Sequence, residues 1–352
     1  MTDVSECEIA GRKIGVSHPP YIVCELSANH NGSLERALQL IEAAAATGAD
    51  AIKIQTYTPD TITIDCDNAQ FMIKGGLWDG YKLYELYAQA YTPYEWHPAL
   101  FAKARDVGVT LFSTPFDETA LDLLVKLQAP AYKIASFEAA DTALVARVAT
   151  VGKPLIISTG TSRPEDITET VATARLAGND AIVLLHCVSA YPAQPRDSNL
   201  RTIPHLAKRH GTLVGLSDHT LGTAAAVSAV ALGACVVEKH FTLRRADGGP
   251  DAAFSLEPPE FAALVRDCRT AWESLGEVRE GFQQAAESNL VFRRSLYAVR
   301  DIAPGAKLTA ENIRSIRPGF GLAPKHLPDV MGRHARVAIP RGTPMSWDLV
   351  ER

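Results

Sequence analysis

The chain has 352 residues, 47% of them hydrophobic and 21% charged, as in a globular protein with one large domain and a small one, or with two domains. The formal net charge of −5 gives no reason to expect nucleic acid or an anionic membrane as a partner. The longest apolar runs, such as 224–231, are too short to span a bilayer.

Short apolar runs alternate with amphipathic segments from residue 21 to residue 275. The runs expected as strands are 21–26, 51–56, 110–115, 131–136, 154–159, 181–188, 213–219 and 234–241. The segments expected as helices are 33–47, 92–107, 117–127, 141–151, 163–177, 203–210, 223–232 and 259–275. Eight strand–helix repeats in about 255 residues predict an α/β fold with a closed (β/α)8 TIM barrel.

A doubly wound open sheet is the competing interpretation. It would usually carry a glycine-rich first turn, but 27–32 contains one glycine, so the dinucleotide fingerprint is absent. A hairpin is predicted before the first strand, at 8–15, and it could plug the lower mouth of the barrel.

One insertion, 59–91, separates the second strand from its helix and is rich in aromatic residues. They are Trp78, Tyr81, Tyr84, Tyr87 and Tyr91. Because long loops after barrel strands usually cover the active site, these side chains could line a substrate pocket. They could equally form a small core for the insertion itself.

The character of the sequence changes after Glu277. Short alternating runs at 295–300 and 335–339, with turn signals at 303–305 and 340–342, predict a small, mainly β domain. We therefore expect a barrel domain at 1–280 and a second domain at 281–352.

The six cysteines show no C-x-x-C spacing, which excludes a zinc ribbon or a thioredoxin motif. Cys24, Cys187 and Cys235 lie in apolar runs, where cysteine usually acts as a small hydrophobe. We expect reduced thiols in a cytoplasmic protein.

Two histidines end consecutive strand-like runs. Side chains two apart in a strand share a face, so Ser217 lies beside His219, and Glu238 beside His240. Two imidazoles on neighbouring parallel strands could share one divalent metal. Alternatively, each is a hydrogen-bonded histidine at a strand end.

Every predicted strand ends in polar groups, and in a barrel those ends form the active site. Lys53 and Lys133 each close an apolar run, where an ammonium is costly unless it meets an anion. They could form a cradle for a phosphorylated or carboxylated substrate. The alternative is internal pairing with Glu25, Glu238 or Asp218.

Motifs across nearly the whole chain resemble the sialic acid synthase family, a metal-dependent barrel followed by an antifreeze-like (SAF) domain. The motifs lie at 24–32, 52–55, 113–116, 132–136, 158–160, 185–192, 215–220, 237–242, 293–295 and 317–321. Within the family, 77–78, 83–87, 91–97 and 248–258 resemble the pseudaminic acid synthase branch. The N-acetylneuraminate enzymes typically have Asn where this chain has Ser189.

The resemblance implies a transferase that condenses phosphoenolpyruvate with an open-chain acetamido sugar, releasing phosphate by C–O cleavage. For this branch the sugar is 2,4-diacetamido-2,4,6-trideoxy-altropyranose. The alternatives are an N-acetylneuraminic or legionaminic acid synthase and, outside enzymes, a carbohydrate-binding module.

The resemblance also implies roles for individual residues. His219 and His240 would hold a divalent metal, Mn²⁺ first, with Mg²⁺ or Co²⁺ as alternatives. Glu25 and Glu238 would orient water or sugar hydroxyls and move protons. The candidates for substrate binding are Lys53, Gln55, Lys133, Ser136, Ser158, Ser189, Tyr191, Ser217, Asp251 and Arg317. Arg317 would reach the sugar's acetamido region in the partner subunit, which implies a domain-swapped homodimer.

Overall fold

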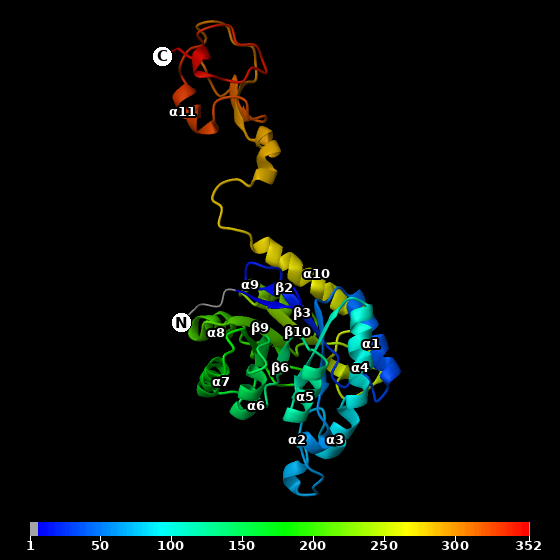
Figure 1. Cartoon of the computed structure of the whole chain (residues 1–352). Helices are drawn as coiled ribbons and strands as arrows, with labels where there is room; N and C mark the ends of the chain where they lie inside the picture. The colour runs from blue at the N-terminus through cyan, green and yellow to red at the C-terminus, as the bar shows by residue number, and fades with distance from the viewer. Residues whose placement is uncertain (1–5, 352) are drawn as a thin grey trace. The chain divides into compact units, whose positions relative to one another are not determined.

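The computed structural model describes residues 6–351 and divides the chain into two compact units, one ending at Gly276 and the other beginning at Glu277. In the first unit, parallel strands close into a barrel in the order β10-β3-β4-β5-β6-β7-β8-β9 (Figure 1). Because β10 pairs with β3, no sheet edge is left open, and the predicted barrel is confirmed over the open sheet.

The barrel strands match the predicted runs: β4 and β5 have the predicted bounds, and the other six are shorter by one to three residues. They are β3 (Tyr21–Glu25), β4 (Ala51–Thr56), β5 (Thr110–Pro115), β6 (Tyr132–Ile134), β7 (Leu155–Ser158), β8 (Ile182–Cys187), β9 (Leu213–Asp218) and β10 (Val236–His240). Several polar residues predicted at strand ends, such as Ser136 and His219, are therefore the first residues of the loops at the barrel mouth.

Helices follow the strands around the barrel. They are α1 (Leu34–Ala46), α4 (His97–Asp106), α5 (Glu118–Lys126), α6 (Thr142–Ala149), α7 (Pro164–Leu176), α8 (Thr202–His210), α9 (Ala224–Ala231) and α10 (Pro258–Leu275). Local chemistry sets their ends: Ser33 and Asp117 accept hydrogen bonds from first-turn amides of α1 and α5, and Gly211 ends α8 in the left-handed region. The insertion after β4 contains two further helices, α2 (Pro59–Ile62) and α3 (Leu83–Ala90).

Strand alternation divides the buried residues into two layers. Along β3, Ile22 packs in the core between strands and helices, while Tyr21 and Val23 face the barrel interior. The hairpin of β1 (Cys7–Ile9) and β2 (Arg12–Ile14) adds Ile9 and Ile14, both fully buried, to that interior core. The hairpin therefore plugs the end of the barrel where the strands begin, as predicted.

An unpredicted ion pair lies on the outer side of the strands. Lys239 Nζ is 2.6 Å from Asp218 Oδ2 and also donates to the carbonyl of Thr220. Both side chains are 1% exposed. Asp218 was counted among the polar strand ends, but it alternates with Ser217 and so points away from the barrel interior.

The second unit has its own small core. Strands β11 (Ser295–Ala298) and β12 (Ile313–Ile316) pair antiparallel, isolated bridges join several loops, and α11 (Leu327–Val330) is its α-helix within the described residues. Leu296, Leu308, Val330 and Ile339 are central to the core. Across residues 6–351, no helix combines the length and the apolar character needed to cross a membrane.

The plug predicts a stability effect. Ile14→Ala removes a fully buried side chain and should lower the free energy of unfolding by about 2–5 kcal/mol, because the barrel floor cannot collapse around the gap. Chemical denaturation followed by circular dichroism measures it. Val16→Ala, at a position 64% exposed, is the control and should change stability little. Equal stability of both variants would contradict the plugging role of the hairpin.

Candidate active site

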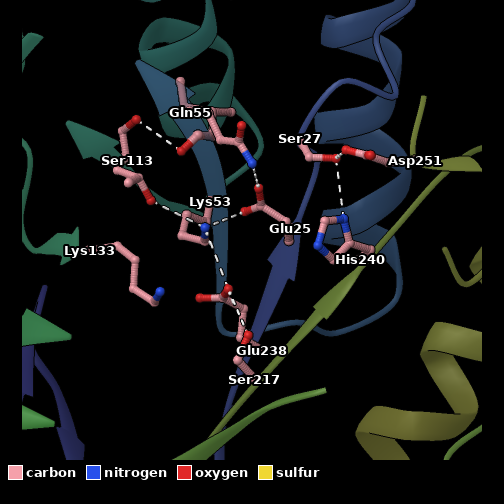
Figure 2. A network of polar contacts seen from close by, with 12 residues as sticks. Glu25, Ser27, Lys53, Gln55, Ser113, Lys133, Ser217, Glu238, His240 and Asp251 are labelled. Atoms are coloured by element: carbon pink, nitrogen blue, oxygen red, sulfur yellow. Dashed lines mark hydrogen bonds and ion pairs between the residues drawn. The ribbon is translucent and has the colours of Figure 1, made fainter. Parts of the chain in front are cut away.

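Inward-facing polar side chains gather where the barrel strands end. Strand register sets Glu25 opposite both Lys53 and His240, and sets Glu238 opposite Ser217 (Figure 2). The same-face pairs predicted from strand periodicity are therefore present, and they meet at one mouth of the barrel.

Lys53 is the centre of this network. Its Nζ lies 2.9 Å from Glu25 Oε2 and 3.5 Å from Glu238 Oε1, and it donates to Thr114 Oγ1 at 3.3 Å (Figure 2). The contact with Glu25 is a buried ion pair. Internal pairing, one of the two interpretations of the sequence, is therefore what the structure shows for Lys53.

The two carboxyl groups differ in environment. Gln55 Nε2 donates to Glu25 Oε1 at 2.8 Å, and Ser217 Oγ donates to Glu238 Oε1 at 3.4 Å. Burial raises the pKa of Glu25, and the neighbouring Glu238 adds to the rise against the opposing effect of Lys53. Burial also opposes ionisation of Glu238, but Lys133 and Lys53 outweigh it and lower its pKa. Of the two carboxyl groups, Glu25 is therefore the one that is protonated more readily.

Lys133 has a different environment from Lys53. It is 2% exposed, and its Nζ donates to the carbonyl of Ile134 at 3.1 Å. Among residues 6–351 no carboxylate lies within ion-pair distance of it. Burial lowers its pKa, and the buried Oγ of Ser158 has no hydrogen-bond partner in the described chain. A buried ammonium without a carboxylate partner and a buried hydroxyl without a hydrogen bond, both within residues 6–351, are suited to an anionic ligand.

Gly160 allows the backbone to come close to the side chains of Ser136, Ser189 and Cys187. Its amide donates to Ser136 Oγ at 3.1 Å, and a Cβ at this residue would collide with Ser189 Oγ and crowd Cys187 Sγ. The backbone can therefore approach these side chains only because residue 160 is glycine.

The two histidines face each other. The ring centroids of His219 and His240 are 5.4 Å apart. His219 Nδ1 lies 2.9 Å from the carbonyl of Val188, which can only accept, so this nitrogen carries the hydrogen. His240 Nδ1 lies 3.2 Å from Ser27 Oγ, which itself donates to Asp251, so this nitrogen also donates. In the neutral form of each ring, Nε2 therefore keeps its lone pair.

That donor set fits a divalent metal with open positions. No hydrogen bond engages either Nε2 within residues 6–351, and burial holds the pKa of His240 well below its usual value, which favours a neutral ligand. For His219, burial is outweighed by the contact with the Cys187 thiol, which raises its pKa. The described residues contain no group of three or more ligands, so the protein would supply two imidazoles and leave other positions to water or substrate.

An aromatic wall closes one side of the histidines. Tyr191 packs on His219 at a centroid distance of 4.3 Å, Phe254 packs on His240 at 4.8 Å, and Trp78 packs on Tyr191 at 5.5 Å. Other aromatic residues of the insertion behave differently, since Tyr87 packs on Tyr57 at 5.8 Å. Trp78 therefore lies in the wall beside the histidines, whereas Tyr87 packs on Tyr57, the residue that directly follows β4.

Comparison with known proteins agrees with this geometry. The profile of the NeuB family matches residues 40–280, and that of the SAF domain matches residues 293–351. The chain belongs to the NeuB family.

Individual relatives cover nearly all of the chain. A pseudaminic acid synthase of Campylobacter jejuni subsp. jejuni (strain 81-176) is 47% identical over 92% of this chain and 94% of its own. The N,N'-diacetyllegionaminic acid synthase of Legionella pneumophila is 35% identical over 96% of both chains. The solved N-acetylneuraminic acid synthetase of Leptospira borgpetersenii, in complex with citrate, superposes with a TM-score of 0.72 at 30% identity, covering 81% of this chain and 95% of that one.

Sequence reasoning missed two side chains near this NeuB-family site. Cys187 was interpreted as a small hydrophobe, but its Sγ lies 3.9 Å from His219 Nδ1 and 3.8 Å from Ser189 Oγ. Strand periodicity could have found it, because Cys187 shares a face with Leu185 in the barrel interior. Burial raises the pKa of Glu138 to about 7, and its Oε2 has no partner in the described chain. In the sequence, Glu138 could have been noticed as an acidic residue two positions after Ser136.

Arg317 belongs to the second unit. It directly follows β12, is exposed, and makes no ion pair within residues 6–351. Its predicted role in a partner's site stays a prediction.

Lys133→Met should weaken phosphoenolpyruvate binding without weakening the fold. Loss of one charge-assisted contact costs about 1.5–3 kcal/mol, or roughly ten- to a hundred-fold in Kd, measured by calorimetry. The Tm should hold or rise, because the variant removes a buried ammonium that no carboxylate pairs. Lys126→Met, on the exposed face of α5, should keep the wild-type Kd. An unchanged Kd in Lys133→Met would exclude the anion-binding role.

Proposed function

We propose that this protein is a pseudaminic acid synthase. It condenses phosphoenolpyruvate with 2,4-diacetamido-2,4,6-trideoxy-altropyranose in its open-chain form. C3 of phosphoenolpyruvate bonds to the aldehyde carbon, water adds at C2, and the C2–O bond breaks to release phosphate. The products are a nine-carbon nonulosonic acid and phosphate.

One observation carries the proposal: at the same barrel mouth lie the buried Lys133, which no carboxylate of residues 6–351 pairs, and two histidines whose Nε2 atoms make no hydrogen bond within those residues. The first suits the anionic enol-phosphate, and the second suits the electrophilic end of the sugar. A carbohydrate-binding module would have no need to bury an ammonium without a counter-ion.

For phosphoenolpyruvate, the proposed ligands are Lys133, Ser136 and Ser158, with Lys53 contributing charge from between its two carboxylates. Glu25, whose pKa burial raises, is suited to give a proton to the oxygen of the former aldehyde. Gln55 holds that carboxyl in place through the bond to its Oε1. Glu238 and Ser217 would orient water on the neighbouring strand pair.

A divalent metal on His219 and His240 is part of the proposal, with Mn²⁺ first and Mg²⁺ or Co²⁺ as alternatives. When bound, such an ion polarises a carbonyl oxygen as a Lewis acid. Ser27 and Asp251 keep the His240 ring oriented, and Val188 does so for His219.

The substrate branch is supported by relatives. The chain is 47% identical to a named pseudaminic acid synthase and 35% identical to a named legionaminic acid synthase. Ser189, at the position where N-acetylneuraminate enzymes typically have Asn, agrees with that choice. N-acetylneuraminic or legionaminic acid synthase remains the second candidate, supported by the structural likeness to the Leptospira enzyme.

We also propose a domain-swapped homodimer in which Arg317 contacts the sugar's acetamido region in the partner's barrel. Its exposed guanidinium, unpaired within the described chain, supports a role toward another molecule. A cytoplasmic location is proposed from the cysteines, all of which are free thiols and four of which are buried.

A substrate panel tests the function. Purified enzyme with phosphoenolpyruvate and Mn²⁺ should release phosphate with the 2,4-diacetamido altrose derivative faster than with N-acetylmannosamine or the legionaminic precursor. Treatment with a chelator should abolish release, and Mn²⁺, Mg²⁺ or Co²⁺ should restore it. Preference for N-acetylmannosamine would refute the assignment to the pseudaminic acid synthase branch. Full activity in the presence of the chelator would refute the requirement for a metal.

Complementation tests the swapped dimer. His240→Ala and Arg317→Ala should each be inactive alone. Mixed by co-expression, they should regain roughly one quarter of wild-type activity, because half of the dimers then hold one intact site built from His240 of one chain and Arg317 of the other. Sites built within one chain would give no recovery. Arg314→Ala, an exposed neighbour on β12, is the control and should be active alone.

A further inference from the structure

We propose that Trp78 is a specificity-determining residue, and that the cavity beside it binds the 4-acetamido group of the sugar. This inference rests on the proposed function and names the part of that sugar which the insertion after β4 recognises.

A cavity of about 270 Å³ lies between this insertion and the loop that follows β10. Its side chains include Leu77, Trp78, Leu86, Gln89, Pro250 and Ala253. Pockets that enclose a whole drug-sized ligand measure roughly 300–1,000 Å³, so this cavity suits one substituent better than a complete sugar.

The cavity adjoins the candidate active site through Trp78, which lines the one and packs beside the other. Trp78 packs on Tyr191 at 5.5 Å, and Tyr191 packs on His219 at 4.3 Å. On the other wall, Ala253 precedes Phe254, which packs on His240 at 4.8 Å. Trp78 is thus two ring contacts from the histidines. A sugar whose aldehyde lies at the histidines would direct its distal carbons, not its C2 substituent, toward the cavity.

The lining matches an acetamido group. Leu77, Leu86 and Ala253 offer apolar surface for the acetyl methyl group. The exposed amide of Gln89 makes no hydrogen bond within residues 6–351 and can serve both the N–H and the carbonyl of the substituent. A hydroxyl at C4 would not cover the apolar surface of the cavity. The C6 methyl group would make no hydrogen bond with Gln89.

The wall is held in position by the protein itself. Trp78 Nε1 donates to the carbonyl of Pro250 at 3.1 Å, and Asn31 Nδ2 donates to the carbonyl of Gly248 at 3.1 Å. Gly249 has a φ of +117° and stands against Asn31, where a Cβ would collide. These contacts order the cavity before a sugar arrives, which lowers the cost of binding.

The test compares kcat/KM for the 2,4-diacetamido sugar and for its analogue with a hydroxyl at C4. Trp78→Ala should reduce the wild-type preference for the diacetamido sugar by about ten-fold or more, while the KM for phosphoenolpyruvate holds. Ala253→Phe fills the cavity, keeps Trp78, and should reduce the preference in the same direction. Trp78→Phe should keep most of it.

Tyr84→Ala is the matched control. Tyr84 lies in the same insertion, and its hydroxyl bonds Asp60 rather than lining the cavity, so the preference should hold. Equal losses for both sugars in Trp78→Ala and Ala253→Phe, or no preference in the wild type, would overturn this inference and leave the proposed function standing. A wild type that turns over N-acetylmannosamine and neither altrose sugar would overturn the proposed function itself.

Discussion

The structure depends on a buried network of charges at the mouth of the closed barrel. Lys53, Glu25 and Glu238 are each no more than 5% exposed. Removing these groups from water is tolerable because the ammonium lies between the two carboxylates, 2.9 Å and 3.5 Å away. The strands that carry them are neighbours around the barrel, so closure of the sheet creates the ion network. Besides burial, the nearby charge of Lys53 also lowers the pKa of His240.

Two lysines that look alike in the sequence consequently have different states. Lys53 is neutralised by the protein, whereas Lys133 has a backbone carbonyl and no carboxylate partner within residues 6–351. Lys133 could therefore still pair with an anion, and Ser158, whose buried Oγ makes no hydrogen bond in the described chain, ends the neighbouring strand β7. A buried lysine without a carboxylate partner lowers the stability of the fold, but it suits an anionic substrate. Such a trade-off between stability and activity is common at functional sites.

Periodicity predicted the barrel and the faces of its strands well. Ser217 lies opposite Glu238, and His219 lies beside His240, at the same end of the barrel, because side chains two apart in a strand share a face whatever the strand packs against. The insertion was less predictable. Nothing local distinguishes Trp78, which packs on Tyr191, from Tyr87, which packs on Tyr57, because the choice depends on where a long loop folds back. Cys187 is buried, as expected of a small hydrophobe, but an apolar run does not reveal that its thiol lies near His219 and Ser189.

By itself, the sequence determined the eight strand–helix repeats, the polar ends of the strands, the two histidines and the division into two domains. These follow from local periodicity and composition, which act over a few residues. Only the tertiary structure decided which lysine is paired, which histidine nitrogen is free, and which aromatic residue closes the site. Those outcomes depend on distances between residues far apart in the chain, such as Ser27 and His240 or Trp78 and Pro250, and on the loss of water when they meet.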